Sequence, residues 1–71
     1  MSTRKNAISR LEIKRRTVGF SRAELARRAK IPVPTIMAFE HGDRNINKAR
    51  YDTLKKLADA LHTSIEEIVE V

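Results

Sequence analysis

The strongest constraint on the fold is the stretch from Ser21 to Gly42, which carries two short amphipathic patterns separated by a brief break. Neither pattern is longer than about two turns, and helices that short are marginal by themselves in water. The two helices must therefore stabilise each other by packing their apolar faces together. Read at helical spacing, the residues that form these faces and the corner between them are Leu25, Ala26, Ala29, Ile36, Phe39 and Ile31.

Local signals place the ends of both helices. Ser21, followed three residues later by Glu24, reads as a capping box, which predicts a helix over about 22–29. Proline disfavours the α conformation in the residue before it, so Val33 is predicted to be extended and to cap a second helix over about 34–41. A glycine follows that helix and ends it. The second helix is therefore short and has a rigid start.

Apolar spacing elsewhere predicts three more helices around this pair. One covers about 7–18, and another covers 51–61 with Tyr51 as its first apolar residue. Ser64 with Glu67 makes a second capping box, which opens a last short helix. No alternating stretch is long enough for a strand. The predicted fold is all-α, a compact domain of five short helices.

Length and composition limit the kind of protein this can be. Seventy-one residues suffice for one domain, expected over 7–71, with residues 1–6 as a flexible polar arm. The chain has no cysteine and its two histidines lack the spacing of a zinc site, so neither disulfides nor a metal or cofactor is expected. No run approaches the ~20 apolar residues of a membrane span, so we expect a cytoplasmic protein. The acidic residues near residue 70 have no nucleophile beside them, which argues against an enzyme.

The net charge of +6 is unevenly distributed along the chain. Residues 1–30 contain ten basic residues against two acidic ones, whereas residues 31–71 contain five against seven. A polar distribution of charge orients a protein on an anionic surface, either nucleic acid or membrane. The plainer alternative is that the charge only keeps a small domain in solution, although solubility requires no such segregation.

Two helices joined by a tight turn, with the outer face of the second one free, have the geometry of a helix-turn-helix. The segment SRAELARRAKIPVPTIMAFEHG resembles the helix-turn-helix of the Cro and phage-repressor family (XRE type), and DTLKKLADALHTSIEEIV resembles that family's closing helices. Together they cover about residues 8–70. The resemblance implies a phage-repressor-like DNA-binding fold with a central helix-turn-helix, and a sequence-specific regulator that binds double-stranded DNA.

The resemblance also implies which residues face the DNA. Arg22 stands at a phosphate-contacting position that is usually glutamine, and Thr35 stands at another in the recognition helix. The positions that usually meet base edges, or lie beside them, hold Val33, Pro34, Met37 and Ala38. The loop positions that grip the backbone hold His41, Arg44, Asn45 and Lys48. No base-facing side chain here can make a bidentate hydrogen bond, so readout should depend on thymine methyls, with polar help from Thr35, His41 or Arg44, or on DNA shape.

Two further implications of the resemblance concern conformation and charge. Lys30 and His62 stand where the family usually has glycine, and holding a residue other than glycine in the left-handed conformation costs roughly 1 kcal/mol. Arg15 and Glu40 align with a partly buried ion pair of the family. The alternative for this pair is two solvated surface charges.

The functional expectation is a repressor that occupies an operator through the helix at about 34–41. A dimer on a palindromic operator would make a single weak half-site contact useful. The homodimer contact is expected from the C-terminal helix, unless its apolar residues only complete the core of their own chain. These residues are Ile65, Ile68, Val69 and Val71. The alternative from another class is an antitoxin or other protein-interaction module, whose apolar C-terminal surface binds a partner protein.

Overall fold

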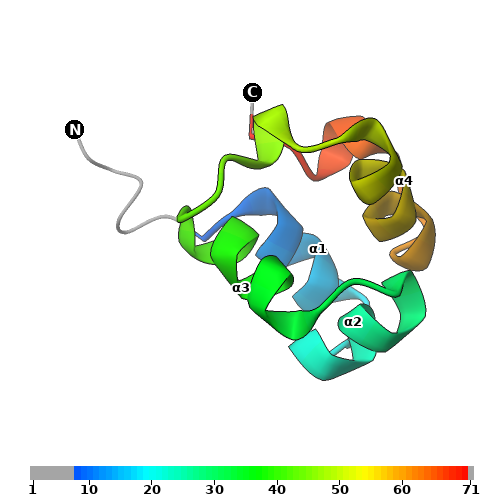
Figure 1. Ribbon diagram of the computed structural model, residues 1–71. Helices are drawn as coiled ribbons and strands as arrows, with labels where there is room; N and C mark the ends of the chain where they lie inside the picture. The colour runs from blue at the N-terminus through cyan, green and yellow to red at the C-terminus, as the bar shows by residue number, and fades with distance from the viewer. Residues whose placement is uncertain (1–7, 71) are drawn as a thin grey trace.

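The computed structural model describes residues 8–70, so the predicted arm over residues 1–6 lies outside the described range. Within that range the protein is all-α and contains no strand, as the sequence predicts (Figure 1). Its elements, in chain order, are α1 (Arg10–Thr17), α2 (Arg22–Ala29), α3 (Val33–His41), the 3-10 helix η2 (Ile46–Lys48), α4 (Tyr51–Ala60) and the 3-10 helix η3 (Ile65–Glu67). The predicted last helix forms only as this short 3-10 helix, and Ser64 makes no side-chain capping bond, so the count of five helices is not confirmed.

Serine caps begin the first two helices. The hydroxyl of Ser21 accepts a hydrogen bond from the backbone N–H of Glu24 at 3.0 Å, which confirms the predicted start of α2. Ser9 accepts an equivalent 3.0 Å bond from the N–H of Glu12. α1 therefore starts at Arg10, later than predicted, because this cap and not the apolar spacing decides where the helix begins.

α3 begins one residue earlier than predicted. Pro32 is its N-cap, with φ −59° and ψ 144°, and Val33 is already helical. The predicted extended conformation of Val33 is wrong, because a following proline disfavours the α conformation but does not forbid it. Pro34 lies in the first turn of the helix, where its missing N–H removes no intrahelical hydrogen bond.

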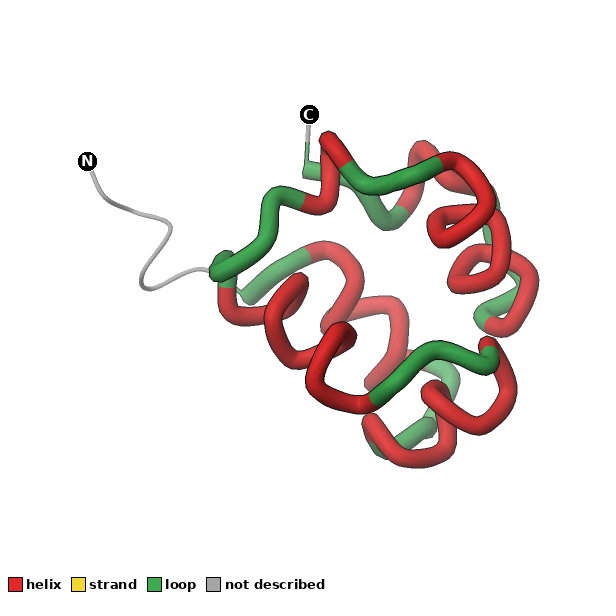
Figure 2. The backbone as a smooth tube through the Cα atoms, viewed as in Figure 1, coloured by secondary structure: helices red, strands yellow, loops and turns green. Residues whose placement is uncertain are grey.

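The helices enclose one core. α2 packs against both α3 and α4, and η3 packs against α4 and α1. Figure 2 shows the short loop that joins α2 to α3, which is the arrangement of a helix-turn-helix. Of the residues predicted to hold this pair together, Ala26 is partly buried and the others are buried: Leu25, Ala29, Ile31, Ile36 and Phe39. The core therefore supports α3 from one side and leaves its other side to solvent.

Two hydrogen bonds tie the last described residues to the rest of the domain. The carboxylate of Glu70 accepts from the backbone N–H of Arg10 at 2.7 Å, and the N–H of Glu70 donates to Oδ1 of Asn47 at 2.8 Å. Ile46, on the same loop as Asn47, is buried in the core. The loop between α3 and α4 is thereby fixed both from inside and from the C-terminal segment.

Two residues other than glycine have positive φ angles within residues 8–70. Lys30 (φ 60°) ends α2 and His62 (φ 56°) follows α4, which confirms the left-handed conformation implied at both positions.

Glycine adopts this conformation without strain, so His62→Gly is expected to raise the free energy of unfolding by roughly 1 kcal/mol. Urea denaturation measures the change. His41→Gly is the matched control, because His41 is helical and glycine is unfavourable in a helix. A His62→Gly protein no more stable than the wild type would show that the left-handed conformation is not strained.

Candidate nucleic-acid interface

The outer face of α3 is largely apolar. Pro34 and Met37 are exposed there, and Val33 and Ala38 are partly exposed. Helical spacing places these four residues on one face, with the exposed His41 at its C-terminal end. Apart from the imidazole of His41, their side chains carry no hydrogen-bond donor. This face was predicted to lie in the groove, and its chemistry suits thymine methyls better than purine edges.

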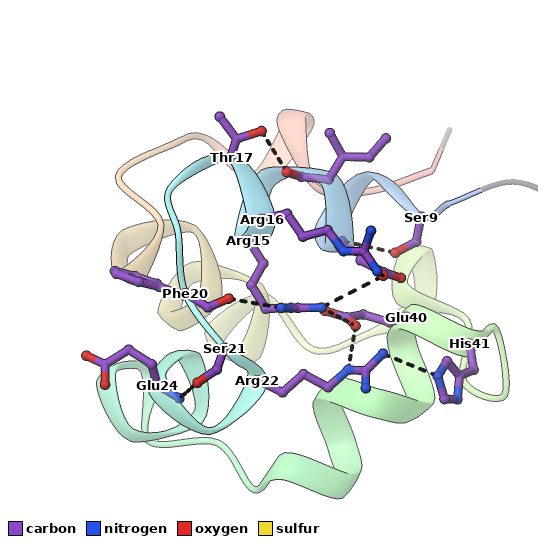
Figure 3. Close-up of polar contacts among 12 residues, drawn as sticks. Ser9, Arg15, Arg16, Thr17, Phe20, Ser21, Arg22, Glu24, Glu40 and His41 are labelled. Carbon is purple, nitrogen blue, oxygen red and sulfur yellow. Dashed lines mark hydrogen bonds and ion pairs between the residues drawn. The ribbon is translucent and has the colours of Figure 1, made fainter.

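A buried carboxylate lies behind this face. The side chain of Glu40 is inaccessible to solvent, and that of Arg15 is only 9% exposed. Nε of Arg15 donates to Oε2 of Glu40 at 2.7 Å, and Nη2 donates to Oε1 at 3.2 Å (Figure 3). The predicted pair is therefore present and bidentate, and the alternative of two solvated charges is wrong.

Glu40 has a second partner that the sequence did not suggest. Nε of Arg22 donates to Oε1 of Glu40 at 2.8 Å, and Nη2 of Arg22 lies 3.4 Å from Nε2 of His41 (Figure 3). Arg22 was predicted to contact phosphate, and its side chain is still 32% exposed. The sequence contained one signal for this contact, because Arg22 stands at a position where the family that the chain resembles usually has glutamine. One carboxylate on α3 thus binds arginines from both α1 and α2.

The polar network extends along α1. Nη1 of Arg15 donates to the backbone carbonyl of Phe20 at 2.9 Å, and Nη2 lies 3.9 Å from the carboxylate of Glu12. Glu12 is itself buried and also pairs with Arg16. Among the residues that the structure describes, no buried side-chain nitrogen or oxygen lacks a hydrogen-bond partner. The network therefore meets the condition under which buried charges are tolerated.

The shared carboxylate stays ionised at neutral pH. Burial by itself would raise the pKa of Glu40, but the hydrogen bonds from Arg15 and Arg22 outweigh burial and lower the pKa below its ordinary value. The pKa of Arg15 is raised, chiefly by its hydrogen bond to Glu40. A charged link therefore holds α3 against the first two helices.

The loop before α4 carries the other predicted backbone contacts. The guanidinium of Arg44 lies over the ring of Phe39, 5.2 Å from the ring centroid. Oδ1 of Asn45 accepts a hydrogen bond from the N–H of Asn47 at 2.9 Å, so part of this side chain serves to hold the loop. Lys48 is exposed. The structure thus brings Arg44, Asn45 and Lys48 to one exposed loop beside α3.

Comparison with known proteins agrees with this geometry. A family model described as the Cro/C1-type HTH DNA-binding domain matches residues 8–71, almost the whole chain. The chain belongs to the Cro/C1-type family. No curated protein and no solved structure gave a significant match.

As a member of the Cro/C1-type family, the chain is a DNA-binding helix-turn-helix domain of the kind found in regulators, and the family is generally not enzymatic. Thr35, which was predicted to contact phosphate, is partly exposed on the edge of α3 nearest α4. Over residues 8–70, no helix is long and apolar enough to cross a membrane. The same residues contain no cluster of histidine, aspartate and glutamate that could hold a metal ion.

The C-terminal segment of the Cro/C1-type domain is mostly used inside its own chain. Ile68 is completely buried, so its predicted part in a homodimer contact is wrong, because its side chain fills the core of its own chain. Ile65 and Val69 are partly buried against that core, and Val71 lies outside the described residues. Tyr51, predicted among the apolar residues of α4, is instead 69% exposed. The apolar surface open to a partner is therefore smaller than predicted and includes Tyr51.

Proposed function

We propose that this domain is a transcriptional regulator that binds double-stranded DNA sequence-specifically, and that it acts as a repressor by occupying an operator through α3. The observation that supports the proposal is the exposed outer face of α3, which has arginines on both sides. Arg22 flanks it on the side of α2, and Arg44 flanks it on the side of the loop before α4. With an arginine on each side, α3 can enter the major groove while the two guanidinium groups contact phosphates on the two walls of that groove.

Reading of the operator is expected to be mainly apolar. Val33, Pro34, Met37 and Ala38 can contact the methyl groups of thymines but cannot form the paired hydrogen bonds that discriminate purines. His41 supplies the one polar group on this face. We therefore expect a modest ratio of specific to non-specific affinity for each half-site, with a preference for A·T-rich sequence.

Two copies of the domain would compensate for this modest discrimination. Copies related by a two-fold axis would place their α3 helices in half-sites ~34 Å apart on one side of the duplex. The surface offered for the contact between copies comprises Tyr51 and the exposed parts of Ile65 and Val69. A surface this small supports a dimer that forms mainly on DNA.

The experiment that tests the proposal is selection of bound sequences from a random duplex pool, at one fixed salt concentration. We expect enrichment of an A·T-rich palindrome with half-sites about one helical turn apart. Recovery of a single asymmetric site would contradict the dimer, and recovery of no enriched sequence would contradict sequence-specific binding. Placing the selected site over a promoter then tests repression, because occupancy there should silence a reporter.

A further inference from the structure

A cationic cleft of about 260 Å³ lies between α3 and α4, on the edge of α3 opposite to Arg22. Figure 1 shows α3 and α4, the two helices that contribute to its lining. Thr35 lines it from α3 and Thr53 from α4. Its four cationic lining residues are Lys30, Arg44, Arg50 and Lys56. They come from the turn of the helix-turn-helix, from the loop before α4 and from α4 itself.

The lining of this cleft carries an excess of positive charge, and Asp59 lies beside Lys30 and Lys56 only in the neighbouring hollow. None of the lining residues of the cleft is acidic. Arg50 pairs only with the exposed Asp52, at 3.3 Å. Within residues 8–70, neither Lys30 nor Lys56 forms an ion pair with a carboxylate, although Lys55 next to Lys56 does. Cations gathered around one cleft repel each other, and an anion placed among them would relieve that repulsion.

One feature of the backbone favours an anion in the same place. Lys30, with φ 60°, ends α2 at this corner. The helices α3 and α4 both begin at the cleft, with Pro32 and Arg50 as N-caps, and neither has a side-chain capping bond. The positive ends of two helix dipoles therefore add to the side-chain charges.

We propose that this cleft binds a phosphate group, and that Lys30 and Lys56 are ligands of that phosphate together with Arg44 and Arg50. Thr35 lines the same cleft from α3 and carries a hydroxyl that can donate to a phosphate oxygen. The phosphate has two possible sources, a phosphodiester of DNA on this wall of the groove or free inorganic phosphate. The first source rests on the proposed DNA binding, whereas the second does not.

The test compares two variants of equal charge. Lys30→Gln with Lys56→Gln removes two charges from the cleft, and Lys14→Gln with Lys55→Gln removes two lysines that lie outside it and pair with Glu67 and Asp59. Thermal melting checks that both proteins fold. Lys30→Gly is a third variant, which removes a cleft charge and relieves the strain of its backbone.

The first measurement titrates inorganic phosphate into each protein at constant ionic strength, without DNA, and follows backbone amide NMR shifts. In the wild type and in the control variant, we expect shifts that concentrate around Thr35 and Thr53. The cleft variant and Lys30→Gly should lose them. The second measurement is the salt dependence of DNA binding, where loss of one phosphate contact should reduce the slope of log K against log salt by about 0.9 in the cleft variant relative to the control.

A response to free phosphate with equal salt slopes would support a phosphate site that takes the free ion. A reduced slope without a response to free phosphate would support a site for the DNA backbone. If neither measurement separates the cleft variant from the control, the proposal is wrong. If no protein binds DNA at all, the proposed function fails, and the phosphate titration still decides whether the cleft binds phosphate.

Discussion

Replacing Glu40 with alanine is expected to lower the free energy of unfolding by ~3 to 5 kcal/mol, because the substitution removes the bidentate partner of the buried guanidinium of Arg15 and leaves it only the carboxylate of Glu12, 3.9 Å away. A domain of this size has a total stability of only about 4–10 kcal/mol. The variant should therefore be close to unfolded at room temperature. Urea denaturation at neutral pH, with and without a stabilising osmolyte, measures the loss.

Glu24→Ala is the matched control for this experiment. Glu24 also binds two arginines, Arg27 and Arg28, but all three side chains lie at the surface. Surface ion pairs contribute little because solvent screens them, so the melting temperature should stay near that of the wild type. Similar melting temperatures for both variants would mean that the burial of Glu40 has no energetic consequence.

The same link should make stability depend on acid. The folded protein lowers the pKa of Glu40, so the contribution of its charge is complete above the ordinary value of about 4.3 and is lost as the pH falls through the folded pKa. Glu40→Gln lacks this titration but keeps the other carboxylates. The stability difference between wild type and Glu40→Gln should therefore shrink from pH 6 to pH 3. A difference that stays constant would contradict this assignment.

Ala38→Glu is expected to weaken DNA binding by about 100-fold or more, since a carboxylate placed on the reading face would meet the phosphates and base edges of the groove. Ala38 is partly exposed within a helix, and glutamate is a good helix former, so the fold should be retained. Titration of a fluorescent duplex carrying the selected operator measures the affinity.

Ile13→Glu controls for the change in net charge. Ile13 is half exposed on α1, outside the proposed interface, and gains the same negative charge when replaced. The affinity of the Ile13→Glu variant for DNA should fall only through long-range repulsion between its added charge and the phosphates, and added salt screens that repulsion. If the two variants weaken binding equally at every salt concentration, α3 is not the helix that enters the groove.

Local signals predicted the parts of this fold that depend on neighbouring residues. The serine cap at Ser21 decided the start of α2, and the apolar spacing around it identified the buried contacts with α3. The same rule would have found Ser9 and corrected the start of α1, since Ser9 and Glu12 have the spacing of Ser21 and Glu24. Ser64 has that spacing too, yet its hydroxyl makes no capping bond, so the pattern alone does not guarantee a cap.

Contacts between distant residues were harder to predict. The family resemblance suggested Arg15 with Glu40, but nothing in the spacing of Arg22 indicates that it reaches the same carboxylate from another helix. The complete burial of Ile68 depends on how the C-terminal segment returns to α1 and α4, which a one-dimensional pattern does not contain. The cationic cleft likewise exists only because three separate segments converge on one place.

Arg15 and Arg22 depend on Glu40 to different degrees, and this difference determines which of these residues can be replaced without unfolding the domain. Arg15 and Glu40 are both buried, so neither can be replaced alone without a large loss of stability. Arg22 is partly solvent-exposed, and its replacement leaves the pair of Glu40 and Arg15 intact. The effects of substitutions at the three positions are therefore not additive, and their order matters. The arginine nearest the proposed DNA surface can drift first, which lets binding preference evolve without passing through an unfolded ancestor.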